Sequence, residues 1–460
     1  MRNGGVSFWY AATALPGRRP PLQGDVTADV CIVGGGFTGL WTAYYLKRER
    51  PDLDIAVVER EFAGYGASGR NGGWLSAAFS GSREAMARRH GRQAVIELAR
   101  AMQATVDEVL EVCRAEAIDA DQLKHGLLRV ARNPAQAARL EASIVEERGW
   151  LPDPERDLVA LDCAALLDRV HVEGARAGSW TPHAARVQPA KLVQGLAGAV
   201  ERLGVTIYEG TSATAAQPGR VETDRGVVRA RHVLTCLEGF TAGLAGQRRT
   251  WLPLNSAMIA TAPLTAGAWE RLGWSGDELL GDEAHAYMYA QRTADGRIAL
   301  GGRGVPYRFG SRTDRDGRTQ RTTIEQLIGT LRDMFGEPVR DVAIEHAWCG
   351  VLGVPRDWSP TVAFDPATGM GMAGGYVGHG VATTNLAGRT LRDLVLGRET
   401  ELTRLPWVGK AARRWEPEPL RFAGSRLVYG LYRAADRREM ASGTAATSRL
   451  ARVASAISGR

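Results

Sequence analysis

Apolar and polar positions near the amino terminus follow one another in an order that predicts a strand, a turn, a helix and a second strand. Residues 29–33 form a short apolar run of the kind found in buried strands. A helix is expected over 40–47 and is ended by Pro51, and residues 54–59 are apolar in the middle and finish on an acid. Together these segments have the length and order of one βαβ unit.

The rest of the chain shows alternating helical and strand patterns. Helices are expected over 84–116, 135–147, 189–203, 324–335 and 381–396. Strands are expected over 205–208 and 231–235, and then over 255–260, 286–290 and 297–300 around a turn at 294–296. These patterns predict an α/β protein with a β-rich middle.

The turn after the first strand carries a dinucleotide fingerprint. Gly34 suits the tight turn, Gly36 lets the backbone approach a pyrophosphate, and Gly39 lets helix and strand pack closely. Glu59 stands 20 residues beyond Gly39, where a carboxylate can bind an adenosine ribose. Two later glycine runs match the same spacing but lack this context, and the pattern alone leaves FAD and NAD open. The candidate cofactor-binding residues here are Gly34, Gly36, Phe37, Thr38, Gly39, Glu59 and Arg60.

Length, charge and cysteine usage narrow the class of protein. The 460 residues suffice for two or three domains. The net charge of +7 favours an arginine-rich surface over nucleic-acid binding, because no nucleic-acid motif accompanies it. The five cysteines are scattered without CxxC spacing, which argues against disulfides and a structural metal and fits the cytoplasm. No apolar run approaches the ~18 residues of a membrane span, and no signal-peptide stretch is expected.

Three motifs together resemble the D-amino-acid-oxidase-like (DAO) superfamily of FAD-dependent oxidoreductases. They are the fingerprint, the run Gly-Ala-Ser-Gly-Arg-Asn-Gly-Gly over 66–73, and Gly-Tyr-Val-Gly-His-Gly-Val over 375–381. The likeness covers about residues 7–397, and the 66–73 run is closest to the γ-glutamylputrescine oxidase and glycine oxidase-like branch. It implies a Rossmann-like FAD-binding domain over 1–82, 155–245 and 345–400. It also implies an interleaved α+β substrate domain with a mostly antiparallel sheet over 83–154 and 246–344.

The resemblance also implies roles for residues around a non-covalently bound FAD. Residues of the 66–73 run would line the pyrophosphate and flavin: Ser68, Arg70, Asn71, Gly72 and Gly73. Ala213 would place backbone against the adenine. Gly378, His379, Gly380 and Val381 would lie at a helix N-terminus beside the flavin pyrimidine ring, where a helix dipole stabilises the negative charge of reduced flavin.

The chemistry next to the flavin is predicted to be oxidation of a C–N bond. Aromatic walls hold a cationic amine and exclude water, and Tyr287, Tyr289 and Trp348 are candidates, with Trp74 and Tyr376. Arg303, or Arg292, could clamp a substrate carboxylate. The predicted catalytic residues are Tyr287, Tyr289, Arg303, Trp348 and His379.

Several positions depart from the family pattern. Ala382 stands where sarcosine oxidase-like members have a carboxylate-binding lysine, and residues 247–249 lack the lysine that activates oxygen. An oxidase using O₂ and a dehydrogenase using another acceptor therefore both stay open. Glu238 replaces a turn residue and either approaches the ligands or caps a turn. Cys349 is one residue away from a position that some relatives link to flavin, which favours non-covalent binding.

The function predicted from these features is FAD-dependent oxidation of a small amine, amino acid or acylated polyamine, by hydride transfer to flavin N5, giving an imine that hydrolyses. The alternatives are a flavin-dependent hydroxy-acid dehydrogenase and a non-catalytic flavin-binding subunit. Residues 401–460 form a basic, partly helical extension, in which a helix over about 420–435 either packs on its own domain or contacts a membrane surface or partner.

Overall fold

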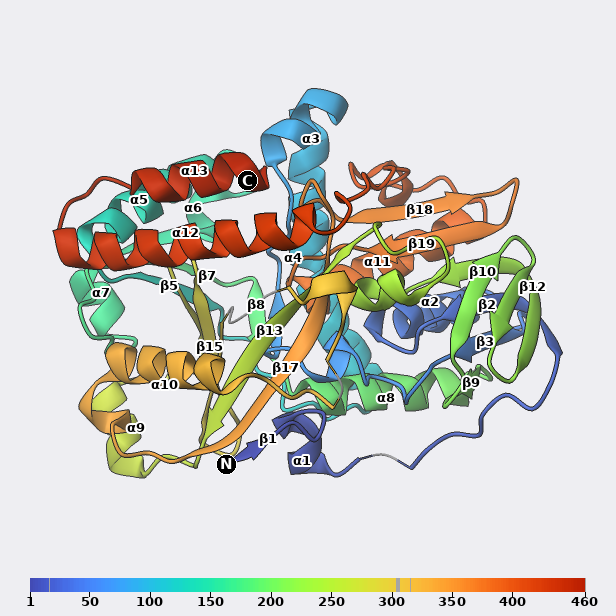
Figure 1. The fold of residues 1–460 in the computed structure, drawn as a ribbon, viewed down its shortest axis with the longest axis horizontal. Coiled ribbons are helices and arrows are strands. Elements are labelled where there is room, and N and C mark those ends of the chain that lie inside the picture. The colour runs from blue at the N-terminus through green and yellow to red at the C-terminus, as the bar shows by residue number, and fades with distance from the viewer. Residues whose placement is uncertain (16, 303–306, 315, 460) are drawn as a thin grey trace.

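The fold is described from a computed structural model of the chain, for residues 1–15, 17–302, 307–314 and 316–459. Within these residues two large sheets lie side by side, the smaller at the right of Figure 1 and the larger at its centre and left. The smaller sheet has the strand order β10-β11-β12-β2-β3-β9, and β19 joins it through β12. Three of these strands are β10 (Ala213–Gln217), β11 (Arg220–Thr223) and β19 (Met370–Gly374).

The smaller sheet is built on the predicted βαβ unit. Strand β2 (Val26–Val33) pairs in parallel with β3 (Ile55–Val58) and with β12 (Gly226–Thr235), and β9 (Thr206–Tyr208) pairs with β3. Successive residues of β2 enter two different cores: Ile32 packs with the helices, and Cys31 packs on the opposite face. This alternation buries both faces of the sheet, as parallel strands require.

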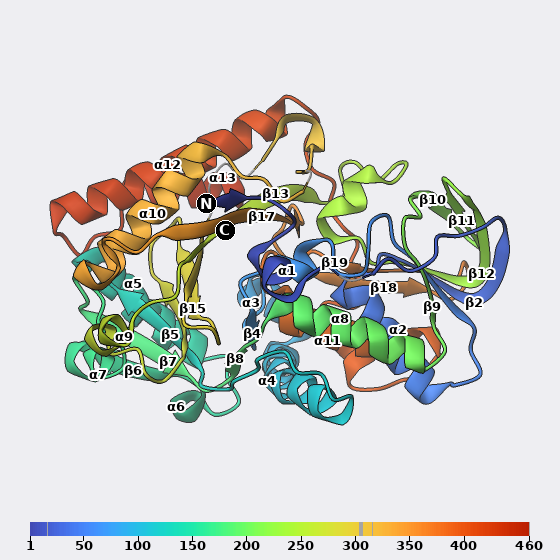
Figure 2. The same ribbon diagram turned by 90° about the horizontal axis from the view of Figure 1, so that it is seen from below.

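Four helices cover one face of this sheet. They are α2 (Phe37–Glu49), α4 (Arg92–Ala115), α8 (Pro189–Arg202) and α11 (Gly380–Val395), and their apolar faces share one core with β2 and β3. Figure 2 shows α2, α8 and α11 gathered beside the strands, with α1 (Phe8–Thr13) near the junction of the two sheets. Helix α2 begins directly after the fingerprint glycines.

The larger sheet is mostly antiparallel, as predicted. Its centre is β13 (Leu252–Thr261), which pairs with β17 (Ile344–Val354) and with β16 (Ile298–Gly302). The sheet continues through β15 (Met288–Arg292), β14 (Leu279–Asp282), β5 (Leu127–Ala131), β7 (Ala177–Thr181) and β6 (Val159–Asp162). Helices α9 (Ala266–Leu272) and α10 (Arg321–Phe335) pack on it and close a second core.

The two sheets divide the chain differently from the predicted domain limits. Strands β6 and β7 fall within 155–245, and β17 falls within 345–400 apart from its first residue, yet all three belong to the larger sheet. Helix α4, within 83–154, packs on α11 and shares a core with the smaller sheet. The predicted limits do not follow the sheets, because strand partners are distant in sequence, which a local pattern does not record. The helix expected over 84–116 is also interrupted, since Gly91 (φ +86°) separates α3 (Arg83–His90) from α4.

The carboxyl-terminal extension folds as two helices packed on each other, α12 (Leu420–Ser442) and α13 (Arg449–Ser458), seen in red in Figure 1. Val428, Tyr432 and Ala435 of α12 share a core with Ala451 and Ala454 of α13. Much of the apolar face of α12 is therefore covered within the chain. In the part of the chain described, no helix is long and apolar enough to cross a membrane.

Candidate functional site

The fingerprint turn is closed to any side chain at two of its glycines. Gly34 has a φ of +113°, and a Cβ there would lie 2.6 Å from the carbonyl oxygen of Cys236. A Cβ on Gly39 would lie 2.1 Å from the carbonyl oxygen of Gly34. Both contacts are with backbone, which cannot move aside cheaply, so these positions require glycine.

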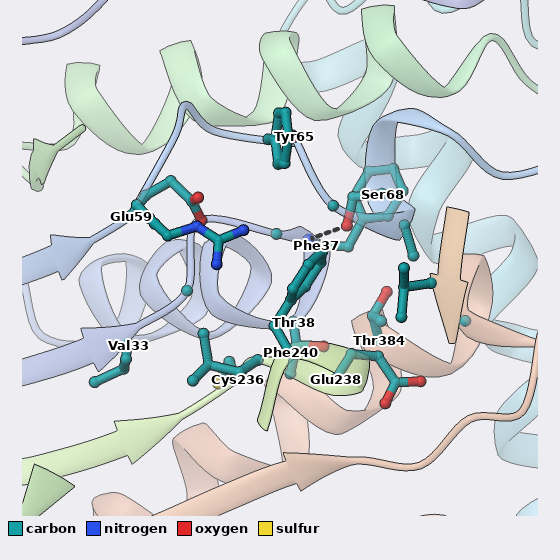
Figure 3. Close-up of a pocket in the computed structure, with 18 of the residues that line it drawn as sticks. Val33, Phe37, Thr38, Glu59, Tyr65, Ser68, Cys236, Glu238, Phe240 and Thr384 are labelled. Atoms are coloured by element: carbon teal, nitrogen blue, oxygen red, sulfur yellow. Dashed lines mark hydrogen bonds between the residues drawn. The ribbon is translucent and has the colours of Figure 1, made fainter. Parts of the chain in front are cut away.

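The amino end of α2 meets the second glycine run. The backbone N–H of Phe37 donates a hydrogen bond of 2.8 Å to Ser68 Oγ, drawn as a dashed line in Figure 3. Gly36 is the N-cap of the helix, and a Cβ there would come within 3.0 Å of the same oxygen. The free amides and the positive dipole end of the helix favour a phosphate at this point.

Glu59 directly follows β3, beside this turn. Its Oε2 accepts a hydrogen bond from the Gly35 N–H and its Oε1 accepts one from the Glu61 N–H, both at 2.9 Å. Burial raises the pKa of the Glu59 carboxyl above its usual value. Each carboxylate oxygen keeps a further lone pair, so the group can still accept hydrogen bonds from ribose hydroxyls.

One cavity, called here the cofactor cavity, runs from this turn to the amino end of α11. The sequence-predicted residues that line it are Gly34, Gly36, Phe37, Thr38, Glu59, Arg60, Ser68, Asn71, Ala213, Gly378, Gly380 and Val381. Sequence reasoning missed its apolar walls, which include Tyr65, Leu237, Phe240 and Leu352. In Figure 3, Glu59 lies at the left and Glu238 toward the lower right, with Phe240 labelled between them.

A smaller cavity, called here the aromatic cavity, adjoins the first and shares Asn71, Gly378 and Val381 with it. It brings together other predicted residues: Arg70, Gly72, Tyr287, Tyr289 and His379. Sequence reasoning assigned no role to Ser256, whose Oγ lies 2.8 Å from Tyr289 Oη. Trp74 packs edge-on against the Tyr289 ring, with 5.9 Å between the ring centroids. The glycine run lies directly against the Tyr289 ring, since a Cβ on Gly72 would come within 2.7 Å of it.

Two predicted residues lie elsewhere. Trp348 is fully buried against Phe8 and Trp9, and its Nε1 donates to the carbonyl oxygen of Arg70 at 2.9 Å. It lines neither of the two described cavities, because its side of β17 faces α1, so these cavities give no support to its prediction as a substrate wall. Gly73 also reaches neither, because a Cβ there would lie 2.0 Å from the amide nitrogen of Gln291.

Arg292 and Arg303 are the two arginines predicted to bind a substrate carboxylate. Arg292 stacks on Trp269, and its Nε lies 3.2 Å from an oxygen of Asp277, so it forms a structural ion pair. Arg303 lies outside the described residues. Arg292 is not among the residues that line the aromatic cavity.

Arg70 belongs to the second glycine run, and its side chain is buried within the protein. Its guanidinium is buried, pairs with Asp314 at 2.7 Å and stacks on Tyr65. Its Nη2 atom has no hydrogen-bond partner among the described residues. A buried donor of this kind is suited to an additional acceptor, and Arg70 is one of the residues that line the aromatic cavity.

Glu238 fixes the loop that precedes α11. Its Oε2 accepts from the Gly375 N–H at 2.9 Å and its Oε1 accepts from the Tyr376 N–H at 3.1 Å. Burial raises the pKa of Glu238 to about 7, against the opposing effect of these N–H donors. Tyr376 in turn places its Oη 3.1 Å from Thr38 Oγ1 on α2. Glu238 therefore both lines the cofactor cavity and ties its two ends together.

The amino-terminal segment was not predicted to contribute, yet it holds the second glycine run in place. Ser7 Oγ donates to the carbonyl oxygen of Gly69, and Trp9 Nε1 donates to that of Asn71, each at 2.8 Å. The partners in each contact are 62 positions apart in the sequence, so a local pattern cannot predict these contacts.

Cys349 is placed away from both cavities. Its thiol is buried and donates to the carbonyl oxygen of Arg318 at 3.2 Å. Burial raises the pKa of this thiol to about 12, which disfavours the reactive thiolate. The surroundings of Cys349 therefore agree with non-covalent FAD binding.

The cofactor cavity fits FAD. Its glycines leave the N-terminus of α2 free of side chains, where the pyrophosphate would lie. The Glu59 carboxylate lies beside this turn, where it could bind the ribose, and apolar residues line much of the cavity. A continuous, largely apolar space with a few polar groups is suited to a dinucleotide. The chain's own residues therefore provide groups suited to the pyrophosphate, the ribose and the apolar parts of FAD.

Comparisons with known proteins agree with this geometry. The family model for FAD-dependent oxidoreductases (DAO) matches residues 29–394. The γ-glutamylputrescine oxidoreductase of Escherichia coli is 29% identical over 401 residues, which cover 85% of this chain and 89% of that protein. A probable oxidoreductase, OrdL, of Rhizobium meliloti is 29% identical over 404 residues, covering 86% and 89%.

Solved structures show the same fold. Glycine oxidase from Geobacillus kaustophilus superimposes with a TM-score of 0.70 at 20% identity, covering 85% of this chain and all of that one. L-Proline dehydrogenase from P. horikoshii gives a TM-score of 0.69 at 15% identity, covering 84% of this chain and 98% of that one. The chain therefore belongs to the DAO family of FAD-dependent oxidoreductases.

Proposed function

We propose that the enzyme oxidises the C–N bond of a small amine in the aromatic cavity, giving an imine that hydrolyses to a carbonyl compound and an amine. The observation that carries the proposal is the placing of Tyr287, Tyr289 and Trp74 next to Gly72 and Val381, where the aromatic cavity adjoins the cofactor cavity. FAD, when bound, supplies the hydride acceptor. The names of the similar proteins, which include amine and amino-acid enzymes, support this class of substrate.

The aromatic rings are suited to the first requirement of the reaction. An amine arrives as an ammonium ion, and ring faces attract a cation within about 6 Å of their centroids. Tyr289 is held by Ser256 and by Trp74, so its ring is fixed before the substrate binds. A fixed and largely dry wall aims the substrate's C–H bond and excludes water.

The aromatic cavity presents little net charge to a substrate, so the attraction for an amine would come from the aromatic rings. Among the described residues that line it, Arg70 is the one with a permanent positive charge, and Asp314 already neutralises it. The amino end of α11 contributes its dipole from the other side, with His379 as the N-cap residue. That dipole would stabilise negative charge that develops beside it.

The cell compartment and the electron acceptor are part of the same proposal. We place the enzyme in the cytoplasm, because the five cysteines Cys31, Cys113, Cys163, Cys236 and Cys349 are all unpaired thiols. The electrons would pass to O₂ or to another acceptor.

Anaerobic mixing of the FAD-loaded protein with amines, amino acids and hydroxy acids tests the proposal. We expect amines to bleach the flavin absorbance and to yield a carbonyl product with release of ammonia or an amine. Bleaching by hydroxy acids alone would favour a hydroxy-acid dehydrogenase, and no bleaching by any compound would favour a flavin-binding subunit. Reoxidation by air, compared with an artificial acceptor, then identifies the acceptor class.

A further inference from the structure

A second cavity, called here the vestibule, adjoins the aromatic cavity. The two cavities share Trp74, Ser76, Tyr287 and His379. Because Tyr287 lines both, the position of its ring decides how much room a substrate has where they meet. What holds Tyr287 in place therefore bears directly on how a substrate binds.

Tyr287 stands at the end of the turn 283–287, which joins the antiparallel strands β14 and β15. On its carboxyl side the hairpin supplies its own support. Asp282 Oδ1 accepts a hydrogen bond of 2.9 Å from the Met288 N–H, which fixes the backbone just after Tyr287. The residues just before Tyr287 are held from outside the hairpin.

Asp436, in helix α12 of the carboxyl-terminal extension, provides that outside support. Its Oδ1 accepts a hydrogen bond of 2.8 Å from the His285 N–H, and its Oδ2 accepts one of 3.0 Å from the Ala286 N–H. Hydrogen bonds to a carboxylate are stronger than those to a neutral acceptor. One carboxylate thus holds two consecutive backbone N–H groups and fixes the direction in which the chain enters Tyr287.

The side chain of His285 makes a separate contact with α12. Its ring stacks on Tyr432, with 5.8 Å between the ring centroids and 12° between the ring planes. Its Nε2 lies 3.0 Å from Glu439 Oε1. Backbone and side chain of the turn are therefore both attached to the same face of α12.

Glu439 extends this attachment to a third element, helix α5 (Pro134–Arg148). The Glu439 side chain is buried, and its Oε2 accepts a hydrogen bond of 2.9 Å from Arg139 Nη1. Arg139 Nη2 in turn donates to the carbonyl oxygen of Glu283 at 2.7 Å. Breaking a buried ion pair by removing one partner is costly, so these contacts hold the start of the turn firmly.

The end of the extension reaches the vestibule from α13. The carbonyl oxygen of Ser458, the last residue of α13, accepts hydrogen bonds from Trp358 Nε1 at 2.9 Å and Arg356 Nη1 at 3.3 Å. Trp358 and Gly459 both line the vestibule. The two helices of the extension thus border the space for a substrate through two separate contacts.

From these contacts we infer that the carboxyl-terminal extension positions the substrate wall, with Asp436 as the positioning residue for Tyr287. The extension lies beyond residues 29–394, so the family match assigns it no role. Asp436 and Glu439 are not among the described residues that line the aromatic cavity or the vestibule, so they act through the turn. The inference rests on the proposed function, since it requires that Tyr287 contacts the substrate.

Asp436→Asn tests the inference with almost no change in side-chain size. An amide has one acceptor oxygen, so it can accept from one of the two N–H groups and presents a donor to the other. Anaerobic stopped-flow reduction of the FAD-loaded enzyme by an amine should give an apparent dissociation constant about fivefold higher. The limiting rate and the affinity for FAD should change less than about twofold. Asp341→Asn, exposed and outside both cavities, is the matched control.

A double-mutant cycle shows whether Asp436 acts through Tyr287. In a Tyr287→Ala background, Asp436→Asn should change the dissociation constant of the amine less than about twofold, because the ring that Asp436 positions is gone. Calorimetric titration with the tetramethylammonium ion repeats the cycle without turnover, since aromatic rings attract this cation and it has no N–H proton to lose. Independent, multiplicative effects of the two substitutions would overturn the inference while leaving amine oxidation intact.

Hydrogen exchange of the FAD-loaded protein measures the attachment of the turn without any substrate. Exchange over 283–288 should be faster in Asp436→Asn than in the wild type and Asp341→Asn. His285→Phe keeps a ring beside Tyr432 but loses the contact with Glu439, and it should show the same direction of change if Asp436→Asn does not fold. Unchanged exchange would overturn the inference.

Failure of the proposed function has a different signature. In that case no amine reduces the flavin of the wild type. Faster exchange and a non-additive tetramethylammonium cycle would then still support Asp436 as the positioning residue for Tyr287.

Discussion

The backbone N–H of Phe37 and the hydroxyl of Ser68 form a 2.8 Å hydrogen bond that joins the two glycine runs of the cofactor cavity (Figure 3). The bond orients the run 66–73 against the amino end of α2, although 31 residues separate the two partners. Each run alone is a glycine loop, and together they form one anion-binding corner.

Ser68→Ala should therefore weaken FAD binding about fivefold, because the loss of one neutral hydrogen bond costs about 1 kcal/mol. Reconstitution of the apoprotein with FAD, followed by flavin fluorescence, measures the dissociation constant. Ser143→Ala is the control, since its hydroxyl bonds within α5, away from the cofactor cavity. Identical affinities in the two variants would contradict the role given to Ser68.

Gly36→Ala should leave the fold intact but reduce FAD affinity more than tenfold. The new methyl group would lie 3.0 Å from Ser68 Oγ, at the point where the backbone must approach the pyrophosphate. Gly198→Ala, on α8, is matched because its methyl group would meet only the flexible side chain of Arg202. Thermal unfolding of both apoproteins separates a folding defect from a binding defect, and retention of FAD by Gly36→Ala would refute the assignment.

Glu238 should give the apoprotein a pH-dependent stability. Its pKa of about 7 in the folded chain exceeds the ~4.3 of an unfolded glutamate, so the folded protein keeps a proton that the unfolded chain has released. The resulting stabilisation is complete below about pH 4 and is lost as the pH rises through 7.

The matched comparison is with Glu238→Gln, which cannot ionise. Between about pH 5 and 8 the Tm of the wild type should fall relative to that of this variant, by an amount that corresponds to at most about 3 kcal/mol. Other titrating groups are common to both proteins and cancel. An unchanged Tm difference would show that Glu238 does not titrate in this range.

Tyr289→Phe and Tyr289→Ala should separate the hydroxyl from the ring. The first loses the 2.8 Å contact with Ser256 and keeps the ring, so the limiting rate of flavin reduction should fall a few-fold at most. The second removes the ring packed on Trp74 and should raise KM for the amine by about tenfold or more. Tyr432→Phe, whose hydroxyl contacts Ser455 in the C-terminal extension, is the control. Equal kinetics for Tyr289→Ala and wild type would remove the tyrosine from the substrate site.

The parts of the fold that could be predicted from the sequence are those encoded locally. The fingerprint, α2 and the acid at Glu59 lie within one short segment, and their order and spacing carry the information. The family resemblance then supplied the partners from distant segments, such as Ala213 and Val381, which line the same cavity.

What the sequence could not give depends on contacts between distant strands and loops. Strand β17 pairs with β13 across about 90 residues, and Trp348 on β17 packs against Trp9 of α1. The roles of Ser7 and Trp9 depend on the same kind of contact. Glu238 departs from the family pattern, and the sequence alone leaves open whether it approaches the ligands or caps a turn. Its hydrogen bonds to the N–H groups of Gly375 and Tyr376 come from a segment that is distant in sequence.

The most direct test of the proposed reaction is anaerobic flavin reduction by one amine, prepared with hydrogen or deuterium on the carbon next to nitrogen. Cleavage of that C–H bond predicts that the deuterated amine bleaches the flavin more slowly and that the deuterium leaves the carbon in the product. A flavin that no amine bleaches, or a product that keeps all its deuterium, would contradict amine oxidation at this site.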